Sequence, residues 1–137
     1  MNNDKEQLLM KKMLDNTKSI AVIGLSDKPS RTSYQIAKAM QQAGYKIIPV
    51  NPNVEEALGE KAYNAILDVK EDFQLINVFR RSVYLYDLSK EIVKTDADYV
   101  WMQPGVTDQA AYDYLTKHNK QVIMDRCIKV AHSVLMR

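Results

Sequence analysis

The chain has 137 residues, with 19 Lys and Arg against 17 Asp and Glu, and therefore a net charge of +2 at pH 7. A balance this close to neutral argues against general nucleic-acid binding, so any anion must be bound by a local group of cations. The single cysteine, Cys127, excludes an internal disulfide and the Cys-rich zinc sites. We expect one globular domain over residues 1–137.

No stretch of the sequence approaches the roughly 20 apolar residues of a membrane span. No apolar signal core follows the polar residues 1–6. We therefore expect a cytoplasmic protein that contacts neither membranes nor nucleic acid. The sequence indicates no protein partner and no oligomeric state.

Apolar residues at helical spacing predict a leading amphipathic helix at about residues 4–16. They are Leu8, Leu9, Met13 and Leu14. The apolar run at 19–24 then predicts a buried parallel strand, because a strand covered on both faces needs apolar side chains on both. Residues 25–32 are typical of a loop. A helix follows from about Ser33 and ends at Gly44.

The alternation of strand and helix continues along the chain. Further strands are predicted at residues 46–50, 75–79, 99–102 and 121–124. The apolar residues that predict the helices between them are Val83, Leu85, Leu88 and Ile92, then Ala111, Tyr114 and Leu115. Pro49 is unusual for a central strand, since it donates no ladder hydrogen bond. The pattern predicts an α/β domain of Rossmann type, with a doubly wound parallel sheet of about five strands, helices on both faces and the leading helix.

Residues that do not suit a core follow each predicted strand directly. These segments are 24–31, 51–53, 80–82, 103–105 and 125–127. The carboxyl ends of parallel strands share one edge of an open sheet, and ligands bind in the crevice outside that edge. Strand ends are ordinarily polar loops, but polarity alone does not account for the adjacent Arg80 and Arg81. The sequence therefore predicts a ligand site at this edge.

The first of these segments has the chemistry of a phosphate site. Gly24 ends the strand where the chain turns, and the next helix would aim free N–H groups and its positive dipole end at the crevice. Charge and hydroxyl groups come from Ser26, Lys28, Arg31, Thr32 and Ser33. The structural alternative makes Ser33 or Thr32 a simple N-cap and Lys28 a solvated charge.

This segment departs from the two common nucleotide motifs. Ser26 and Pro29 stand where the dinucleotide fingerprint has its second and third glycines. Asn51 and Pro52 stand where an acidic residue would bind the ribose hydroxyls. No Gly-Lys-Ser/Thr follows a glycine, so the chain has no P-loop. These departures argue against NAD and against ATP hydrolysis, although the fold favours a nucleotide.

Several segments together resemble the small CoA-binding proteins, which are stand-alone relatives of the CoA-binding domain of the succinyl-CoA synthetase alpha subunit. The resemblance lies in residues 21–33, 44–45, 48–52, 78–80, 101–106 and 124–127. Its most specific parts are the Pro-Val-Asn-Pro and Met-Asp-Arg-Cys segments. It implies a Rossmann-type domain that binds coenzyme A, without the phosphohistidine and nucleotide-grasping regions of the synthetases.

The resemblance and the strand-end positions together give the expected cofactor contacts. They are Gly24, Ser26, Lys28, Pro29, Arg31, Ser33, Asn51, Pro52, Phe79, Arg80, Gln103, Gly105 and Cys127. Arg80 is the first candidate for a CoA phosphate, because a guanidinium pairs with phosphate through two hydrogen bonds. The alternative for Arg80 is a salt bridge to Asp87 or Glu91. Arg81 is expected to be a surface charge.

The other contacts follow from the shape of CoA. Asn51 binds the ribose or adenine edge, or only caps the turn at Pro52. Phe79 and Pro52 sandwich the adenine, unless Phe79 belongs to the core. Gln103 and Gly105 reach the pantetheine amides.

Some residues are expected to have no ligand role. We expect Trp101 in the core, Asp125 and Arg126 in an internal ion pair, and His118 and His132 as structural or solvated residues. No catalytic residue and no metal ligand is expected. The function predicted is a module that binds CoA or an acyl-CoA. The alternatives are a small enzyme that acts on a CoA thioester through Cys127 or Asp125, and an NAD(P)-binding oxidoreductase-like protein.

Overall fold

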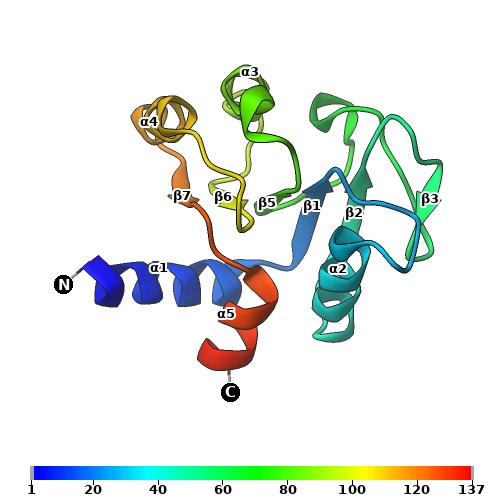
Figure 1. Cartoon of the computed structure of the whole chain (residues 1–137), viewed down its shortest axis with the longest axis horizontal. Coiled ribbons are helices and arrows are strands. Elements are labelled where there is room, and N and C mark those ends of the chain that lie inside the picture. Colours follow the sequence, from blue (N-terminus) through cyan, green and yellow to red (C-terminus); the bar gives the residue numbers. More distant parts are fainter. Residues whose placement is uncertain (1, 137) are drawn as a thin grey trace.

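The computed structural model describes residues 2–136, and their side chains from Asp4 onward. A five-stranded sheet in the order β2-β1-β5-β6-β7 forms its centre (Figure 1). Its strands are β1 (Ser19–Ile23), β2 (Lys46–Val50), β5 (Leu75–Val78), β6 (Tyr99–Met102) and β7 (Gln121–Ile123). Every neighbouring pair runs parallel. The predicted five-stranded parallel sheet is therefore confirmed.

Helices cover both faces of this sheet (Figure 1). One face carries α1 (Asn2–Asn16), α2 (Thr32–Gln42) and α5 (Ile128–Leu135). The other face carries α3 (Leu85–Ile92) and α4 (Gln109–Lys117). The doubly wound arrangement and the leading helix agree with the prediction. None of the described helices is long and apolar enough to cross a membrane.

Alternating side chains of the strands divide the core into two apolar layers. In β1, Ile20 and Val22 belong to the layer under α1, α2 and α5, whereas Ala21 and Ile23 belong to the layer under α3 and α4. Because both faces are covered, the buried positions of the strands are apolar, with Asn77 in β5 as the exception. Trp101 is fully buried in the first layer, as expected.

Pro49 is accommodated because β2 is an edge strand of the five-stranded sheet. Its partner residue on β1 is Val22. On the outer side, the amide of Tyr63 donates to the Pro49 carbonyl at 3.0 Å, and the amide of Asn51 donates to the Tyr63 carbonyl at 2.8 Å. Tyr63, which forms an isolated parallel bridge with Val50, thus covers the carboxyl end of this edge.

The sequence prediction missed the elements between β2 and β5. A two-stranded antiparallel hairpin joins β3 (Glu56–Ala57) to β4 (Glu60–Lys61), and a 3-10 turn, η1, spans Ile66–Asp68. Strands of two residues are too short to show an alternating pattern. Leu58 and Gly59 at the hairpin turn both have positive φ, as tight hairpin turns require.

Two apolar residues that the helical pattern placed on buried faces are on the surface. Leu8 is 71% exposed and Val83 is 75% exposed. The predicted helix through Val83 begins instead with a 3-10 turn, η2 (Ser82–Tyr84), and α3 proper starts at Leu85. The tighter winding of a 3-10 turn directs Val83 away from the core.

Gly24, directly after β1, lies against the backbone of Phe79, directly after β5. Its φ is +85°, and a Cβ placed there would lie 2.0 Å from the carbonyl oxygen of Phe79. The amide of Phe79 donates to the Ile23 carbonyl, and the amide of Gly24 donates to the Val50 carbonyl, both at 2.8 Å. Hydrogen bonds on both sides therefore prevent the chain from moving aside for a side chain.

Replacing Gly24 by alanine should lower the free energy of unfolding by roughly 2–4 kcal/mol, because a strained positive φ adds to an overpacked contact. Gly59→Ala is the matched control: its φ is +79°, but a Cβ placed there would have no non-neighbouring atom within 4 Å. That control should lose only about 1–2 kcal/mol, the backbone strain alone. Chemical denaturation measures both. Equal losses would show that the Phe79 carbonyl does not constrain position 24.

Candidate functional site

A cleft of about 360 Å³ opens at the carboxyl ends of β1, β2 and β5. The chain passes from β1 to β2 on one side of the sheet, and β5, β6 and β7 follow on the other. The cleft therefore lies at the topological switch point, where open parallel sheets bind their ligands. The edge predicted from the strand ends does carry a cavity.

Five of the predicted contact residues meet in the walls of this cleft. They are Gly24, Asn51, Pro52, Phe79 and Arg80. The other wall residues that bear on ligand chemistry are Asn53, Asn64, Ile66, Leu88 and Glu91. Glu91 comes from α3 and Asn64 from the segment after the hairpin, so neither follows a strand of the sheet directly. Strand-end reasoning could not select them.

The remaining predicted residues lie outside the walls of the cleft. They are Ser26, Lys28, Pro29, Arg31, Ser33, Gln103, Gly105 and Cys127. Those before Gln103 form the loop between Gly24 and α2 and the start of that helix, whereas the last three belong to the strand ends of β6 and β7. Their contacts show which of them are engaged within the protein.

Hydrogen bonds shape the loop after β1 from within. Ser33, which is 8% exposed, accepts a hydrogen bond on Oγ from the amide of Ser26 at 3.0 Å. The Ser26 Oγ accepts one from the amide of Lys28, also at 3.0 Å. The N-cap residue of α2 is Arg31, which makes no side-chain cap. The alternative in which Ser33 or Thr32 is a simple N-cap is therefore not realised, and Ser33 instead ties the loop to its helix.

The positive end of α2 remains open. Gln35 makes the first hydrogen bond of the helix, from its amide to the Arg31 carbonyl at 3.1 Å. The amides of residues 32–34 precede it and have no intrahelical acceptor. Lys28 and Arg31 are exposed beside them. A helix N-terminus with two neighbouring cations has the chemistry of an anion site.

Asn51 joins two of the loops that border the cleft. Its Nδ2 donates to the Leu25 carbonyl at 3.1 Å, and its Oδ1 accepts from the amide of Asn53 at 3.0 Å. The alternative in which Asn51 caps the turn at Pro52 is thus realised. Each of its two polar atoms keeps one further hydrogen-bonding position, so a ligand contact remains compatible with the cap.

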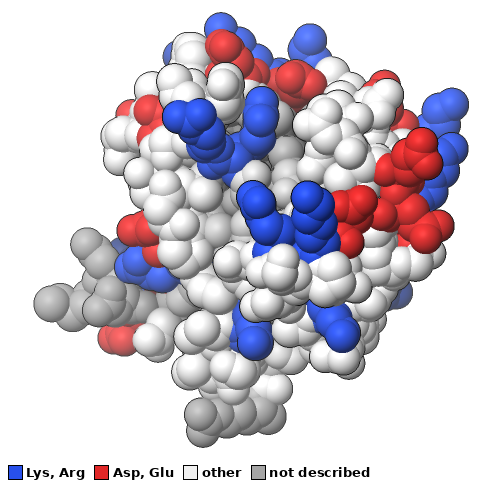
Figure 2. Space-filling model, turned by 45° about the vertical axis from the view of Figure 1, so that its right-hand side comes forward, with Lys and Arg blue, Asp and Glu red and all other residues white. Residues whose placement is uncertain are grey.

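Arg80 stands at the lip of the cleft as an exposed cation. Its guanidinium carbon lies 4.4 Å above the ring centroid of Tyr84. The ion pairs found among the described residues do not include Arg80, so the alternative salt bridge to Asp87 or Glu91 is not formed. Figure 2 shows Lys and Arg side chains gathered around a hollow near the centre of one face.

The strand ends of β5, β6 and β7 are tied to one another. Ser82 Oγ donates to the Gly105 carbonyl at 3.1 Å, and the amide of Gly105 donates to Asp125 Oδ1 at 2.8 Å. Gln103, only 2% exposed, accepts on Oε1 from the amide of Ile128 at 3.1 Å and so holds the start of α5. Its Nε2 is buried without an acceptor among the described residues.

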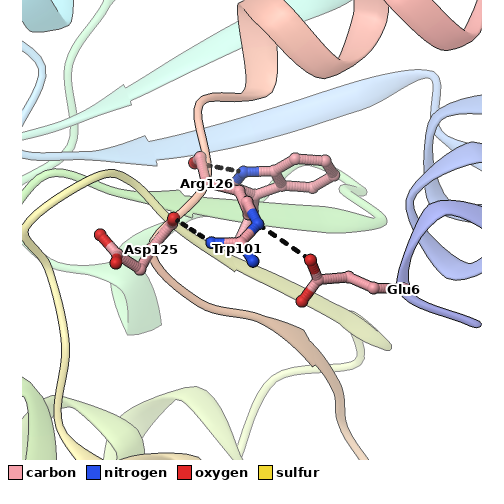
Figure 3. Close-up of polar contacts among 4 residues, drawn as sticks. All are labelled: Glu6, Trp101, Asp125 and Arg126. Carbon is pink, nitrogen blue, oxygen red and sulfur yellow. Dashed lines mark hydrogen bonds and ion pairs between the residues drawn. The ribbon is translucent and has the colours of Figure 1, made fainter. Parts of the chain in front are cut away.

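Arg126 pairs with a carboxylate of α1 rather than with the carboxylate of Asp125 (Figure 3). Its Nε donates to Glu6 Oε1 at 2.9 Å. One of its terminal nitrogens donates to the backbone carbonyl of Asp125, and its own carbonyl accepts from Trp101 Nε1, both at 2.9 Å. The expected ion pair between Asp125 and Arg126 is therefore wrong, because the Arg126 guanidinium pairs with the Glu6 carboxylate and the Asp125 carboxylate accepts from the amide of Gly105.

Cys127 and the two histidines stand away from the cleft. Cys127 is the half-buried N-cap residue of α5 and lines an apolar groove of about 240 Å³ between α1 and α5. His118 ends α4 on the surface, and the ring of His132 meets that of Tyr45 edge-on. No His, Cys, Asp and Glu cluster suited to a metal ion occurs in the part of the chain that the structure describes.

Comparison with known proteins places these features in a family. The family described as CoA binding domain matches residues 18–133. The uncharacterized protein YneT of Bacillus subtilis is 49% identical over 125 residues, which cover 91% of this chain and 93% of that protein. The ADP-forming acetate–CoA ligase of Methanocaldococcus jannaschii is 38% identical over 64 residues, which are 47% of this chain and only 9% of the ligase.

Solved structures share the whole fold. A hypothetical protein from Pyrococcus horikoshii OT3 superposes with a TM-score of 0.91 at 27% identity, covering 96% of this chain and 92% of that one. A Thermus thermophilus protein gives 0.90 at 31% identity, with 94% and 98% covered. These matches confirm the resemblance seen in the sequence. The chain belongs to the CoA-binding domain family and is a distant relative of the CoA-binding region of ADP-forming acetate–CoA ligases.

Proposed function

We propose that this protein binds coenzyme A or an acyl-CoA at the carboxyl-end rim of its sheet, as a binding module with no chemistry of its own. The observation that carries the proposal is the cleft at the switch point between β1 and β5, which has Arg80 at its lip. Membership of a CoA-binding family makes CoA the ligand class to test first.

The cleft suits the adenosine part of CoA. Pro52 and Phe79 supply apolar surface on opposite strand ends, where an adenine ring would stack. The carboxamides of Asn51, Asn53 and Asn64 supply donors and acceptors for the edges of the base and the ribose. Small-molecule sites typically combine apolar walls with a few polar groups in this way.

The phosphates of CoA would find cations on both sides of the cleft. Arg80 follows β5, while Lys28 and Arg31 lie in the loop that leads to the open N-terminus of α2. CoA carries a diphosphate and a separate 3′-phosphate, so it needs more than one cationic contact. Two groups of cations from different strand ends meet that need.

The pantetheine arm would run toward the strand ends of β6 and β7. The buried Nε2 of Gln103 lacks an acceptor among the described residues, and an amide carbonyl of pantetheine has the required chemistry. This contact requires the arm to pass beside the start of α5. The Nε2 atom of Gln103 would donate this hydrogen bond, because Oε1 already accepts from the amide of Ile128.

The two alternative functions find less support. A thioester enzyme would rely on Asp125 or Cys127, but the Asp125 carboxylate accepts from Gly105, and Cys127 lines the groove between α1 and α5. An NAD(P) oxidoreductase would place a carboxylate after β2, where Asn51 stands.

Titration calorimetry should show that CoA binds more tightly than NAD or ATP. Of the three, only CoA has an adenosine diphosphate, a 3′-phosphate and a pantetheine arm. It can therefore contact the cleft, the cations and Gln103 at the same time. NAD binding with equal or higher affinity would contradict the CoA assignment. Dephospho-CoA serves as the control that isolates the 3′-phosphate.

Replacing Arg80 by alanine should weaken CoA binding by roughly 1–3 kcal/mol, the value of a charge-assisted hydrogen bond to phosphate. Arg81→Ala is the matched control, because Arg81 is the neighbouring exposed arginine and does not line the cleft. Its effect should be much smaller. Calorimetry at one salt concentration gives both affinities, and thermal unfolding checks that the folds are intact. Unchanged affinity in Arg80→Ala would make Arg80 a structural residue.

A further inference from the structure

Arg80 is held against an aromatic ring rather than a carboxylate. The guanidinium lies 4.4 Å above the ring centroid of Tyr84, well inside the distance at which a cation and a ring attract. Tyr84 does not belong to the walls of the cleft, whereas Arg80 does. The ring therefore acts on the cleft through the arginine.

Two carboxylates close to Arg80 in the sequence could otherwise form a salt bridge with its guanidinium. Asp87 and Glu91 both lie on α3, and Glu91 lines the same cleft as Arg80. A salt bridge to Glu91 would neutralise the cation at the place where an anionic ligand must meet it. An exposed arginine also has many rotamers, and ordering it on binding costs conformational entropy. Stacking on Tyr84 counters both effects.

The backbone that carries the ring is held in place independently of Arg80. Tyr84 ends the turn η2, where its amide donates to the Arg81 carbonyl at 3.0 Å. Ser82 at the start of that turn accepts on Oγ from the amide of Thr107 at 3.0 Å and donates to Gly105. The turn is thus clamped to the loop after β6. Tyr84 itself is 43% exposed, so the ring contributes little to the core.

We propose that Tyr84 is a positioning residue for the anionic ligand of this cleft: its ring holds the Arg80 guanidinium ready for a phosphate and free of Glu91. The proposal rests on the proposed function, since it presumes that a phosphate-bearing ligand enters the cleft. Tyr84 needs only its ring for this role, because the stacked cation meets the face and not the hydroxyl.

A double-mutant cycle with CoA as the probe tests the proposal by calorimetry. Tyr84→Leu should weaken binding about two- to fivefold, the range for an exposed cation–π contact, whereas Tyr84→Phe should bind as the wild type does. In an Arg80→Ala background the Tyr84→Leu change should have no further effect. Tyr86→Leu is the matched control, because Tyr86 is 41% exposed on the adjacent helix and its ring meets Lys90 instead.

The remaining outcomes separate this proposal from its alternatives. An equal loss from Tyr84→Leu with or without Arg80 would mean that the ring contacts the ligand directly, which overturns the positioning role. Tighter binding by Tyr84→Leu would mean that the ring withholds the arginine, which also overturns it. If Glu91 captures the guanidinium once the ring is gone, removing the Glu91 charge should restore binding. The Tyr84→Leu/Glu91→Gln double variant should therefore bind CoA almost as tightly as the Glu91→Gln variant. A wild type that does not bind CoA overturns the proposed function itself.

Discussion

The close approach of β1 and β5 at Gly24 is the constraint on which the site depends. The Phe79 carbonyl occupies the space of a Cβ at position 24, and the amide of Phe79 is bonded to the Ile23 carbonyl. The two strand ends therefore stay together while their loops part, one toward α2 and the other toward η2. Because the loops diverge from strands that cannot separate, a cleft forms above the contact.

Much of the fold could be predicted because the strands carry a strong local signal. Each is a largely apolar run covered on both faces, and each is followed by a segment that contains polar residues, Gly or Pro. The helix α5 gave no such signal. Its eight residues, Ile128–Leu135, make only about two turns, too few for the spacing of their apolar residues to distinguish a helix from a strand. Val130 and Val134 are moreover 57% and 53% exposed, so only part of the apolar face is buried. His132 could not be placed for the same reason.

The site could be predicted only where its residues follow a strand. Asn51, Phe79 and Arg80 meet in the cleft because the parallel sheet brings strand ends to one edge. Glu91 reaches the cleft from the second turn of a helix, and no local pattern marks it. The sequence could not predict the partners of polar residues either. Arg126 pairs with Glu6, which is 120 positions away in the sequence. That pairing depends on how α1 packs against the end of β7.

The polar residues at the carboxyl ends of the strands have two tasks, and their hydrogen bonds within the protein distinguish them. Ser33, Asn51, Gln103 and Asp125 use their side chains to join one loop or helix to another. Lys28, Arg31 and Arg80 are exposed and have no carboxylate partner among the described residues. A frame that is already hydrogen-bonded loses little entropy when a ligand binds, so more of the interaction energy appears as affinity. A phosphate at this edge of the sheet would meet cations that no carboxylate engages, and the one that lines the cleft, Arg80, is stacked on Tyr84.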